Sequence, residues 1–312
     1  MKIRFWGVRG SVPTPLTPFQ VQAKITAAIQ RISEKDLKSP DARQKFISEL
    51  PSWIYGTTGG NTSCVELLGE NDSHIILDAG SGLRPLGKAL AKTDRKNFSI
   101  FLSHFHWDHI QGLPFFDPAY KPDSKIDFYS AVEDARQKIS LQQEQTFFPV
   151  TFDSMAKNAI FHYVKSGDTL KVEGFDIHVC QMSHPGKSHS FAFEQNGKKF
   201  VYATDVELSQ QDFETTDDRE KVFRNADCIV LDSQYTVEEA YKKANWGHSA
   251  FCFAIDFASH WGIKKLFLFH HEPTYDDKKL NSILVAARWY AQYIAQSDLK
   301  VYLACENQEY EI

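Results

Sequence analysis

The sequence lacks three features that would assign it to a specialised class of protein. No apolar run is long enough to cross a bilayer, and no charged leader followed by an apolar stretch precedes the first strand-like segment. The chain carries 35 Lys and Arg against 40 Asp and Glu, without a long basic run. Because proteins that bind polyanions usually present a basic face, this balance argues against a nucleic-acid partner. We therefore expect a cytoplasmic protein without a membrane partner.

Cysteine is also scarce. The five cysteines are scattered, include no CxxC pair, and are odd in number. Cys64, Cys228 and Cys305 lie in apolar, strand-like runs. This pattern is typical of buried free thiols in a reducing compartment and excludes a disulfide-stapled scaffold.

What the sequence does contain is an alternation of short strands and helices. Ten β-branched or aromatic runs, from "KIRFWG" at the N-terminus to "KLFLFHH" near residue 270, read as strands. Helical patterns fall at about 83–91, 133–145, 217–224, 248–260 and 277–296. At 312 residues and 42% hydrophobic, the chain is long enough for one large α/β domain with helices layered on sheets.

One segment interrupts this alternation. Residues 16–52 read as two short helices broken at Ser39–Pro40, after which strand signals resume. We expect a single domain over residues 1–312 with a helical insertion at about 16–52 that packs on the domain, as a lid or an oligomer contact.

A cluster of metal-capable side chains follows the apolar run that ends near residue 102. The segment "SHFHWDHIQG" holds His104, His106, Asp108 and His109 within six positions. Two histidines spaced by one residue on an extended segment point to the same side, and a helix starting at Asp108 would turn the other two toward them. The alternative is a polar, His-rich turn without metal. The spacing favours a metal site, with two ions about 3.5–4 Å apart if a carboxylate bridges them.

Partners for such a site stand at distant strand ends. His184 follows a strand-like run, Asp205 ends "KKFVYATD", and His270 and His271 end "KLFLFHH". Singly, each also fits a capping or surface role. Together with the first cluster they favour one site built at the edge of a sheet.

The order HxHxDH, His, Asp, His resembles the metallo-β-lactamase superfamily of metal-dependent hydrolases. The resemblance covers the chain outside 16–52 and implies a four-layer αββα sandwich. It implies His104, His106 and His184 as ligands of one divalent ion, Asp108, His109 and His270 as ligands of a second, and Asp205 as the bridging carboxylate. His271 stays open as a replacement for His270. Zn²⁺ is the first expectation for both ions, with Mn²⁺ or Fe²⁺ as alternatives.

Further motifs narrow the resemblance. "FWGVRGSVPTP", "GGNTSCVEL", "ILDAGSGLRPLG" and "HPGKSHSFAFE" resemble the phosphodiesterase branch, which includes tRNase Z, phosphoribosyl cyclic phosphodiesterase and the anti-Pycsar cyclic-nucleotide phosphodiesterases. That branch implies hydrolysis of a small cyclic nucleotide or related cyclic phosphate by a metal-bridging hydroxide, in a homodimer. Asp78 resembles the Asp that orients a metal-binding His. Its alternative is a turn residue before Gly80.

The reaction also needs a proton donor for the leaving oxygen. Asp232 at a strand end and His248, expected at a helix start, resemble the carboxylate–histidine pair of the tRNase Z group, and a carboxylate partner favours a protonated imidazole. A solvent-bonded His248 is the alternative. We assign Asp232, His248 and Asp108 as catalytic groups, Asp108 also as a ligand.

Substrate contacts are less sharply marked. His189, Arg9 and Asn61 are candidates, each with a structural alternative, and Trp107 is expected to pack under its loop. Three other functions compete with the leading prediction: tRNA 3′-end processing, a lactonase or thioesterase activity, and metal binding without catalysis.

Overall fold

The protein is built from two seven-stranded sheets, described here from a computed structural model of residues 1–312. In the first sheet the order is β14 (Glu309–Glu311), β1 (Lys2–Gly7), β2 (Cys64–Leu68), β3 (His74–Leu77), β4 (Asn97–Leu102), β5 (Lys125–Ser130) and β6 (Ala159–Tyr163). In the second the order is β13 (Lys300–Leu303), β12 (Lys265–Phe269), β11 (Cys228–Asp232), β10 (Lys198–Ala203), β9 (His189–Gln195), β8 (Phe175–Gln181) and β7 (Thr169–Val172).

Helices connect and cover these strands. They are α1 (Pro18–Ile29), α2 (Glu34–Leu37), α3 (Pro40–Glu49), α4 (Ser52–Tyr55), α5 (Leu83–Leu90), α6 (Trp107–Ile110), α7 (Ala135–Gln142), α8 (Phe152–Met155), α9 (Asp217–Phe223), α10 (Val237–Lys242), α11 (Phe251–His260) and α12 (Asp277–Tyr293). Short 3₁₀ turns occupy Leu113–Phe115, Asp117–Tyr120 and Gln210–Phe213. None of the helices combines the length and apolarity needed to span a membrane.

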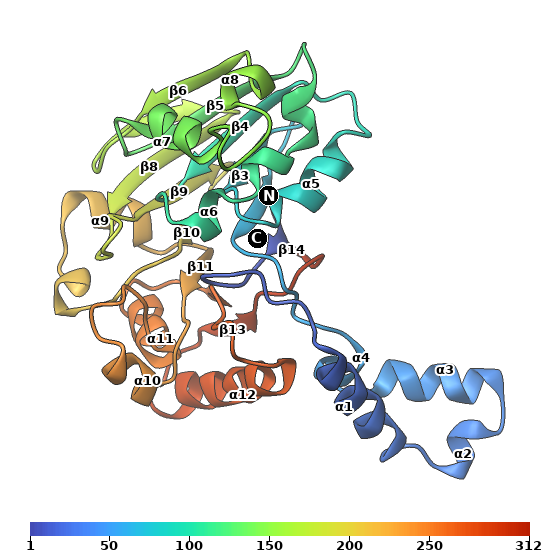
Figure 1. Cartoon of the computed structure of the whole chain (residues 1–312). Helices are drawn as coiled ribbons and strands as arrows, with labels where there is room; N and C mark the ends of the chain where they lie inside the picture. The colour runs from blue at the N-terminus through green and yellow to red at the C-terminus, as the bar shows by residue number, and fades with distance from the viewer.

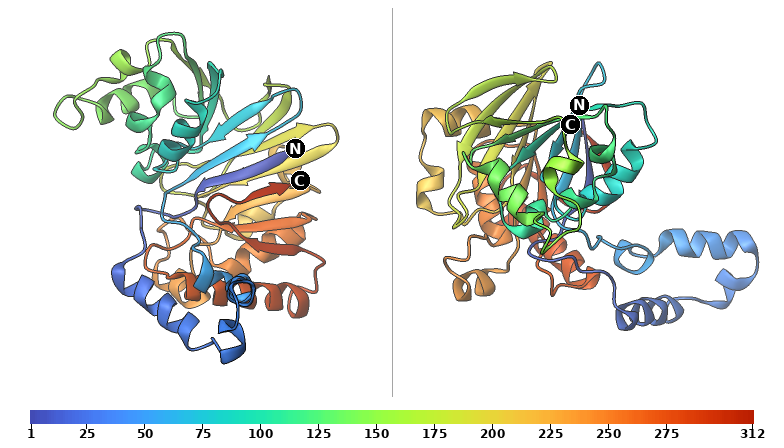
Figure 2. Two further views of the ribbon diagram at one scale, coloured as in Figure 1. Left: turned by 90° about the vertical axis from the view of Figure 1, so that its right-hand side faces the viewer. Right: turned by 45° about the horizontal axis from the view of Figure 1, so that its top comes forward.

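The predicted four-layer αββα sandwich is confirmed. The middle layer of the core lies between the sheets, where Phe101 of the first sheet meets Phe191 and Phe193 of the second and Phe5 meets Phe267 and Phe269. One outer core lies between the second sheet and α9, α11 and α12, and the other between the first sheet and α5 to α8. Figures 1 and 2 show the helices on the two outer faces of the paired sheets.

Strand direction places the polar strand ends at one edge. Strands β3 to β6 run parallel in the first sheet, and β10 to β13 run parallel in the second. Leu77 pairs with Phe101 and Asp232 with Phe269, so the residues that follow these strands leave the sheets together. Carboxyl ends of parallel strands are where open α/β sheets build their sites.

The insertion differs from its prediction in two respects. Ser39 caps α3 and Pro40 is its first residue, so the predicted break is present, but α1 and α2 precede it and make three helices in this span where two were expected. Helices α1 to α3 contain no buried residue. They extend away from the sandwich (Figure 1, blue), so the expectation that the insertion packs on the domain is wrong for α2 and α3, whereas α1 contacts α12 through Lys24.

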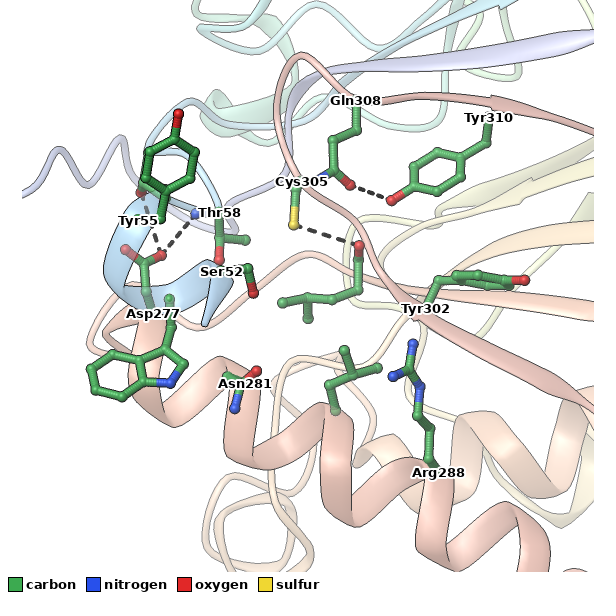
Figure 3. Close-up of a pocket in the computed structure, with 15 residues that line it drawn as sticks. Ser52, Tyr55, Thr58, Asp277, Asn281, Arg288, Tyr302, Cys305, Gln308 and Tyr310 are labelled. Atoms are coloured by element: carbon green, nitrogen blue, oxygen red, sulfur yellow. Dashed lines mark hydrogen bonds between the residues drawn. The ribbon is translucent and has the colours of Figure 1, made fainter. Parts of the chain in front are cut away.

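The base of the insertion does contact the body. Helix α4 lies against α12, and a cavity of about 310 Å³ there is bordered by Asp277, Asn281 and Arg288 of α12 (Figure 3). Asp277 Oδ1 accepts a hydrogen bond from Thr58 N at 2.8 Å, and Asp277 Oδ2 pairs with Lys24 Nζ at 2.6 Å. These contacts tie α1 and the returning chain to α12.

Candidate metal centre

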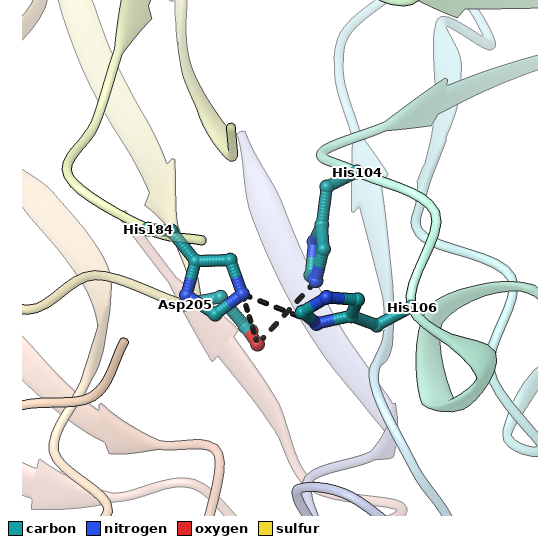
Figure 4. Close-up of side chains that lie close together, drawn as sticks. All are labelled: His104, His106, His184 and Asp205. Atoms are coloured by element: carbon teal, nitrogen blue, oxygen red, sulfur yellow. Dashed lines mark hydrogen bonds and ion pairs between the residues drawn. The ribbon is translucent and has the colours of Figure 1, made fainter. Parts of the chain in front are cut away.

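Four predicted side chains meet in the first of two groups. His104 follows β4, His184 follows β8 and Asp205 follows β10 (Figure 4). His106 Nδ1 lies 3.1 Å from His184 Nε2, and Asp205 Oδ2 lies 3.6 Å from His104 Nε2 and 3.9 Å from His184 Nε2. Three imidazole nitrogens and one carboxylate oxygen therefore converge on one point.

The second group shares Asp205 with the first. Asp205 Oδ1 lies 3.1 Å from His109 Nε2 and 3.3 Å from His270 Nε2. Asp108 Oδ2 lies 3.0 Å from His270 Nε2 and 3.3 Å from His109 Nε2. One oxygen of Asp205 thus faces each group, which is the geometry that a bridging carboxylate needs.

The donors fit divalent cations. His104 Nε2 is buried and has no hydrogen-bond partner, although it faces the first group. Burial alone would lower the pKa of His109, but the carboxylates of Asp205, Asp108 and Asp78 outweigh it and raise this pKa well above its ordinary value. Two buried carboxylates among imidazoles draw positive charge into the site, and imidazole with carboxylate suits Zn²⁺, Mn²⁺ or Fe²⁺.

Asp78 orients the histidines that the first sheet contributes to the site. It is fully buried after β3, and its carboxylate accepts hydrogen bonds from His109 Nδ1 at 2.7 Å, Ser103 N at 2.7 Å, Ser103 Oγ at 2.7 Å and Tyr202 OH at 2.8 Å. Because the Ser103 hydroxyl donates to Asp78, its oxygen accepts from His104 Nδ1 at 3.1 Å. Asp78 therefore fixes the protons of two imidazoles on Nδ1 and leaves both Nε2 lone pairs free for a metal.

The other imidazoles are oriented in the same way. His184 Nδ1 donates to Gly247 O at 2.9 Å, and His270 Nδ1 donates to Gln234 Oε1 at 3.2 Å. Asp108 Oδ2 accepts from Ser11 N at 2.7 Å. Sequence reasoning missed Gln234, Ser11, Ser103 and Tyr202 in these roles. Only Ser103, next to HxHxDH at the end of a strand, stood in a position that could have indicated one.

Tight backbone geometry accompanies these contacts. Asp78, Asp205 and His270 adopt left-handed backbone conformations, with φ of 58°, 52° and 61°. Such conformations cost free energy outside glycine and concentrate at functional sites. Gly247 has φ of 91°, and a Cβ there would lie 2.2 Å from His184 Nδ1, so only glycine fits this position.

A carboxylate–histidine pair lies beside the two groups, as expected from Asp232 and His248. His248 Nδ1 donates to Asp232 Oδ2 at 2.6 Å, and the His248 ring stacks on His270 with centroids 4.9 Å apart. Burial acts to lower the pKa of His248, but the Asp232 carboxylate opposes it and raises the pKa to about 9. The expected helix start is wrong in detail: α11 begins at Phe251, and His248 lies in the preceding loop, where its ring faces the metal groups.

The centre opens into a cavity of about 450 Å³. Ser11, Phe105, His106, Trp107, Asp108, Asp205, His248 and His270 line it. Trp107 is 82% exposed, so the expectation that it packs under its loop is wrong. It occupies the first position of a four-residue helix whose inner face carries Asp108 and His109, and this turns the indole toward solvent.

The remaining candidates fall in different places. His189 borders a neighbouring cavity together with His106, and its Nδ1 is buried without a partner. Arg9 is 3% exposed and donates to the carbonyl oxygens of Gly59, Glu272 and Tyr275, so it braces the backbone and a substrate contact has no geometric support.

Asn61 and His271 have structural roles. Asn61 donates through Nδ2 to Glu306 and accepts from Ser81 Oγ, which leaves its side chain engaged within the protein. His271 points away from the centre and donates through Nε2 to Ala304 O at 2.9 Å. His270, not His271, therefore lies among the candidate ligands.

Comparison with known proteins agrees with this architecture. The profile described as "Beta-lactamase superfamily domain" matches residues 73–271, more than half of the chain. A Ribonuclease Z of Picrophilus torridus is 23% identical over 259 residues, which cover 68% of this chain and 80% of that protein.

Solved structures show the same fold. Zn²⁺-bound PqqB from Methylobacterium extorquens superposes with a TM-score of 0.65 at 13% identity, covering 100% of both chains. The short form of human tRNase Z superposes with a TM-score of 0.59 at 19% identity, covering 100% of this chain and 98% of the other.

Proposed function

The chain belongs to the β-lactamase superfamily, and from that premise we propose that it is a metal-dependent phosphodiesterase that hydrolyses a small cyclic nucleotide or a related cyclic phosphate. One observation carries the proposal. The two oxygens of buried Asp205 face two separate groups of metal-capable side chains, and the His248–Asp232 pair adjoins both. Sites in which one carboxylate bridges two metal ions suit displacement at phosphorus.

The protein's residues have three tasks in this reaction: they hold the ions, they orient the imidazoles, and they supply a proton to the leaving oxygen. His104, His106, His184 and Asp205 would hold one divalent ion, and Asp108, His109, His270 and Asp205 the other, with Zn²⁺ as the first candidate. When bound, the ions would supply Lewis acidity for water activation and for the charge on the phosphoryl oxygens. Asp78, Gln234 and the Gly247 carbonyl hold the imidazoles in the tautomer that binds metal.

His248 provides the proton for the leaving oxygen in this proposal. It lines the cavity at the metal centre, and its Nδ1 is held by Asp232, so Nε2 is the nitrogen left to donate. The Asp232 carboxylate raises the pKa of His248, which favours the protonated ring that a general acid requires.

The direct test compares three substrate classes on protein reconstituted with Zn²⁺ or Mn²⁺. The expected result is hydrolysis of bis(p-nitrophenyl) phosphate, without comparable turnover of a lactone or a thioester. A panel of cyclic mononucleotides then identifies the ring and base by ³¹P NMR. Cleavage of the lactone alone would overturn the phosphodiesterase assignment.

Processing of tRNA 3′ ends is a second candidate because the curated relative is a Ribonuclease Z. The same chemistry at phosphorus would serve it, but the excess of 40 acidic over 35 basic residues gives little attraction for a polyanion. Incubation with precursor tRNA in parallel with cyclic mononucleotides separates the two. Faster cleavage of the tRNA, with a steep salt dependence, would move the assignment to the nuclease.

A further inference from the structure

We propose, resting on the phosphodiesterase function above, that an apolar cavity beside the metal centre binds the aromatic base of a nucleotide substrate. The cavity has a volume of about 540 Å³. Phe105, Trp107 and Ile110 form one part of its lining, and Leu141 and Phe147 form another. This volume lies within the range of small-molecule sites, and no residue of the lining takes part in the chemistry proposed above.

The cavity adjoins the place where the phosphate would lie. Phe105 and Trp107 line both this cavity and the cavity of the metal centre. Trp107 also stands between His106 and Asp108 in the chain, at the start of α6. The backbone of Trp107 is therefore held close to the metal centre, and its exposed side chain borders both cavities. Phosphate and base of a nucleotide are joined through one sugar, which matches two cavities that share a wall.

The aromatic side chains here are unusually exposed. Trp107 is 82% exposed and Phe147 is 70% exposed. Phe115 and Phe148, by contrast, pack edge to face against each other with ring centroids 5.6 Å apart. A planar ring seated against Trp107 and Phe147 would remove this apolar surface from water and gain stacking contacts.

Polar groups at the margin suit a base better than a purely apolar ring. Lys138, which is paired with Asp134, lines the cavity together with the amides of Gln111 and Gln142. Gln142 Nε2 donates to Ile110 O at 3.1 Å, whereas its Oε1 has no hydrogen-bond partner. A small rotation of this amide offers an acceptor to an N–H on the edge of a base. Every base has a face for stacking, so we expect affinity for bases in general with a preference set by these edge contacts.

Binding is tested first, because it does not depend on turnover. Isothermal titration calorimetry on Zn²⁺-reconstituted protein compares adenosine and cytidine 5′-monophosphates with ribose 5-phosphate. We expect the nucleotides to bind at least about 10-fold more tightly than the sugar phosphate, and Trp107→Ala or Phe147→Ala to remove this advantage. Trp289, which is 55% exposed on α12, gives the matched control. Trp289→Ala should still bind nucleotides more tightly than ribose 5-phosphate.

Kinetics supply the second readout. The substrates are a nucleoside 3′,5′-cyclic monophosphate and base-free 1-O-methylribose 3′,5′-cyclic phosphate, followed by ³¹P NMR. Trp107→Ala should lower kcat/KM about 10- to 100-fold more for the nucleotide than for the base-free substrate, and Trp107→Phe should restore most of the difference.

The outcomes distinguish the two proposals. Equal affinity of wild-type protein for nucleotides and ribose 5-phosphate, or equal losses on both substrates in Trp107→Ala, overturns the base site and leaves the phosphodiesterase assignment intact. Absence of diester cleavage in wild-type protein overturns the proposed function, while the titrations still decide whether the cavity binds a base.

Discussion

At the scale of single residues, three of the candidate ligands depend on where the imidazole carries its proton. His109, His184 and His270 each place a proton on Nδ1 by donating to Asp78, Gly247 O and Gln234 respectively. Nε2 then carries the lone pair that faces the centre. In the proposed site these acceptors would control metal binding without touching the metal, and substituting them should weaken metal affinity about 10- to 100-fold.

We predict that His248→Ala lowers kcat about 10²- to 10⁴-fold on substrates with alkoxide leaving groups, because proton donation to the leaving oxygen is lost. The loss should be much smaller with p-nitrophenolate, which leaves without a proton. Metal content by plasma mass spectrometry should stay at the wild-type value. Equal losses on both substrates would exclude His248 as the acid, and exposed His260→Ala is the control.

The pH dependence of kcat follows from the same residue. A general acid works while protonated, so activity is held below the pKa of His248 and lost as the pH rises through it. Asp232 raises this pKa to about 9 in the metal-free chain, and bound cations will pull it lower. We expect an alkaline limb at or below about pH 9 in the wild-type profile. The same limb persisting in His248→Ala would assign it to another group.

Asp205→Ala should reduce the metal content from two ions per chain to one or none. Both groups lose an oxygen at once, because Asp205 Oδ1 faces His109 and Oδ2 faces His104. Asp227→Ala is the control, since Asp227 is also buried but is bonded to Lys199 N and Lys264 far from the centre. Retention of two ions in Asp205→Ala would contradict the bridge.

Residues whose type is required by metal binding could be predicted from the sequence. Residues whose role depends on their neighbours in the fold could not. The predicted ligands meet because few reasons other than metal binding place histidines after three separate strands and a buried aspartate after a fourth. Arg9 could not be read in the same way. A guanidinium serves equally for phosphate and for backbone carbonyls, and its three carbonyl partners come from residues 59, 272 and 275.

At the scale of elements, the strands that the sequence did not reveal share one property. All ten predicted strands are present, and the four that were missed, β6, β7, β13 and β14, are the outermost strands of the two sheets. Edge strands have only one neighbour and keep one side toward solvent. Their burial is incomplete and their composition lacks the continuous apolar run on which recognition depends.

One partly buried lysine helps to anchor the helical insertion to the body. Lys24 Nζ pairs with Asp277 Oδ2 at 2.6 Å and donates to Gly56 O at 2.7 Å. We predict that Lys24→Ala destabilises the protein by about 1–3 kcal/mol, because it leaves buried Asp277 without its cation. Hydrogen exchange should rise in α1 to α3 while metal content stays unchanged.

Lys45→Ala provides the comparison for this prediction. Lys45 pairs with Glu49 at 3.8 Å on the exposed face of α3, and pairs of this kind contribute about 0.5 kcal/mol or less. Equal stability of the two variants by urea unfolding would show that the Lys24 contact does not anchor the insertion.

At the scale of the whole molecule, the metal centre is a seam between the sheets. The candidate ligands follow β4 of the first sheet and β8, β10 and β12 of the second, so ions bound there would cross-link halves that otherwise meet through the apolar middle layer. The layered architecture was predictable because buried parallel strands have long apolar runs. How the insertion sits against that body was not predictable, because α1 to α3 bury no residue that could mark a packed face.

Removal of metal should therefore be felt throughout the protein. We expect chelation by EDTA to lower Tm by about 5–10 °C, since ligands that bind only the folded state stabilise it by several kcal/mol when well above their Kd. Differential scanning calorimetry with and without Zn²⁺ measures this. An unchanged Tm after chelation confirmed by metal analysis would contradict a structural cross-link.

The way in which the helical insertion is attached to the body also affects how its length and sequence can vary among related proteins. Thr14 N donates to Gly60 O at 2.7 Å, so the chain leaves the body and returns to it at adjacent points. Lengthening, shortening or replacing the insertion then alters no distance among the ligands, and the entropy of closing the loop grows only with the logarithm of its length. We therefore expect related proteins to differ more in the length and sequence of this insertion than in the loops that carry the candidate ligands.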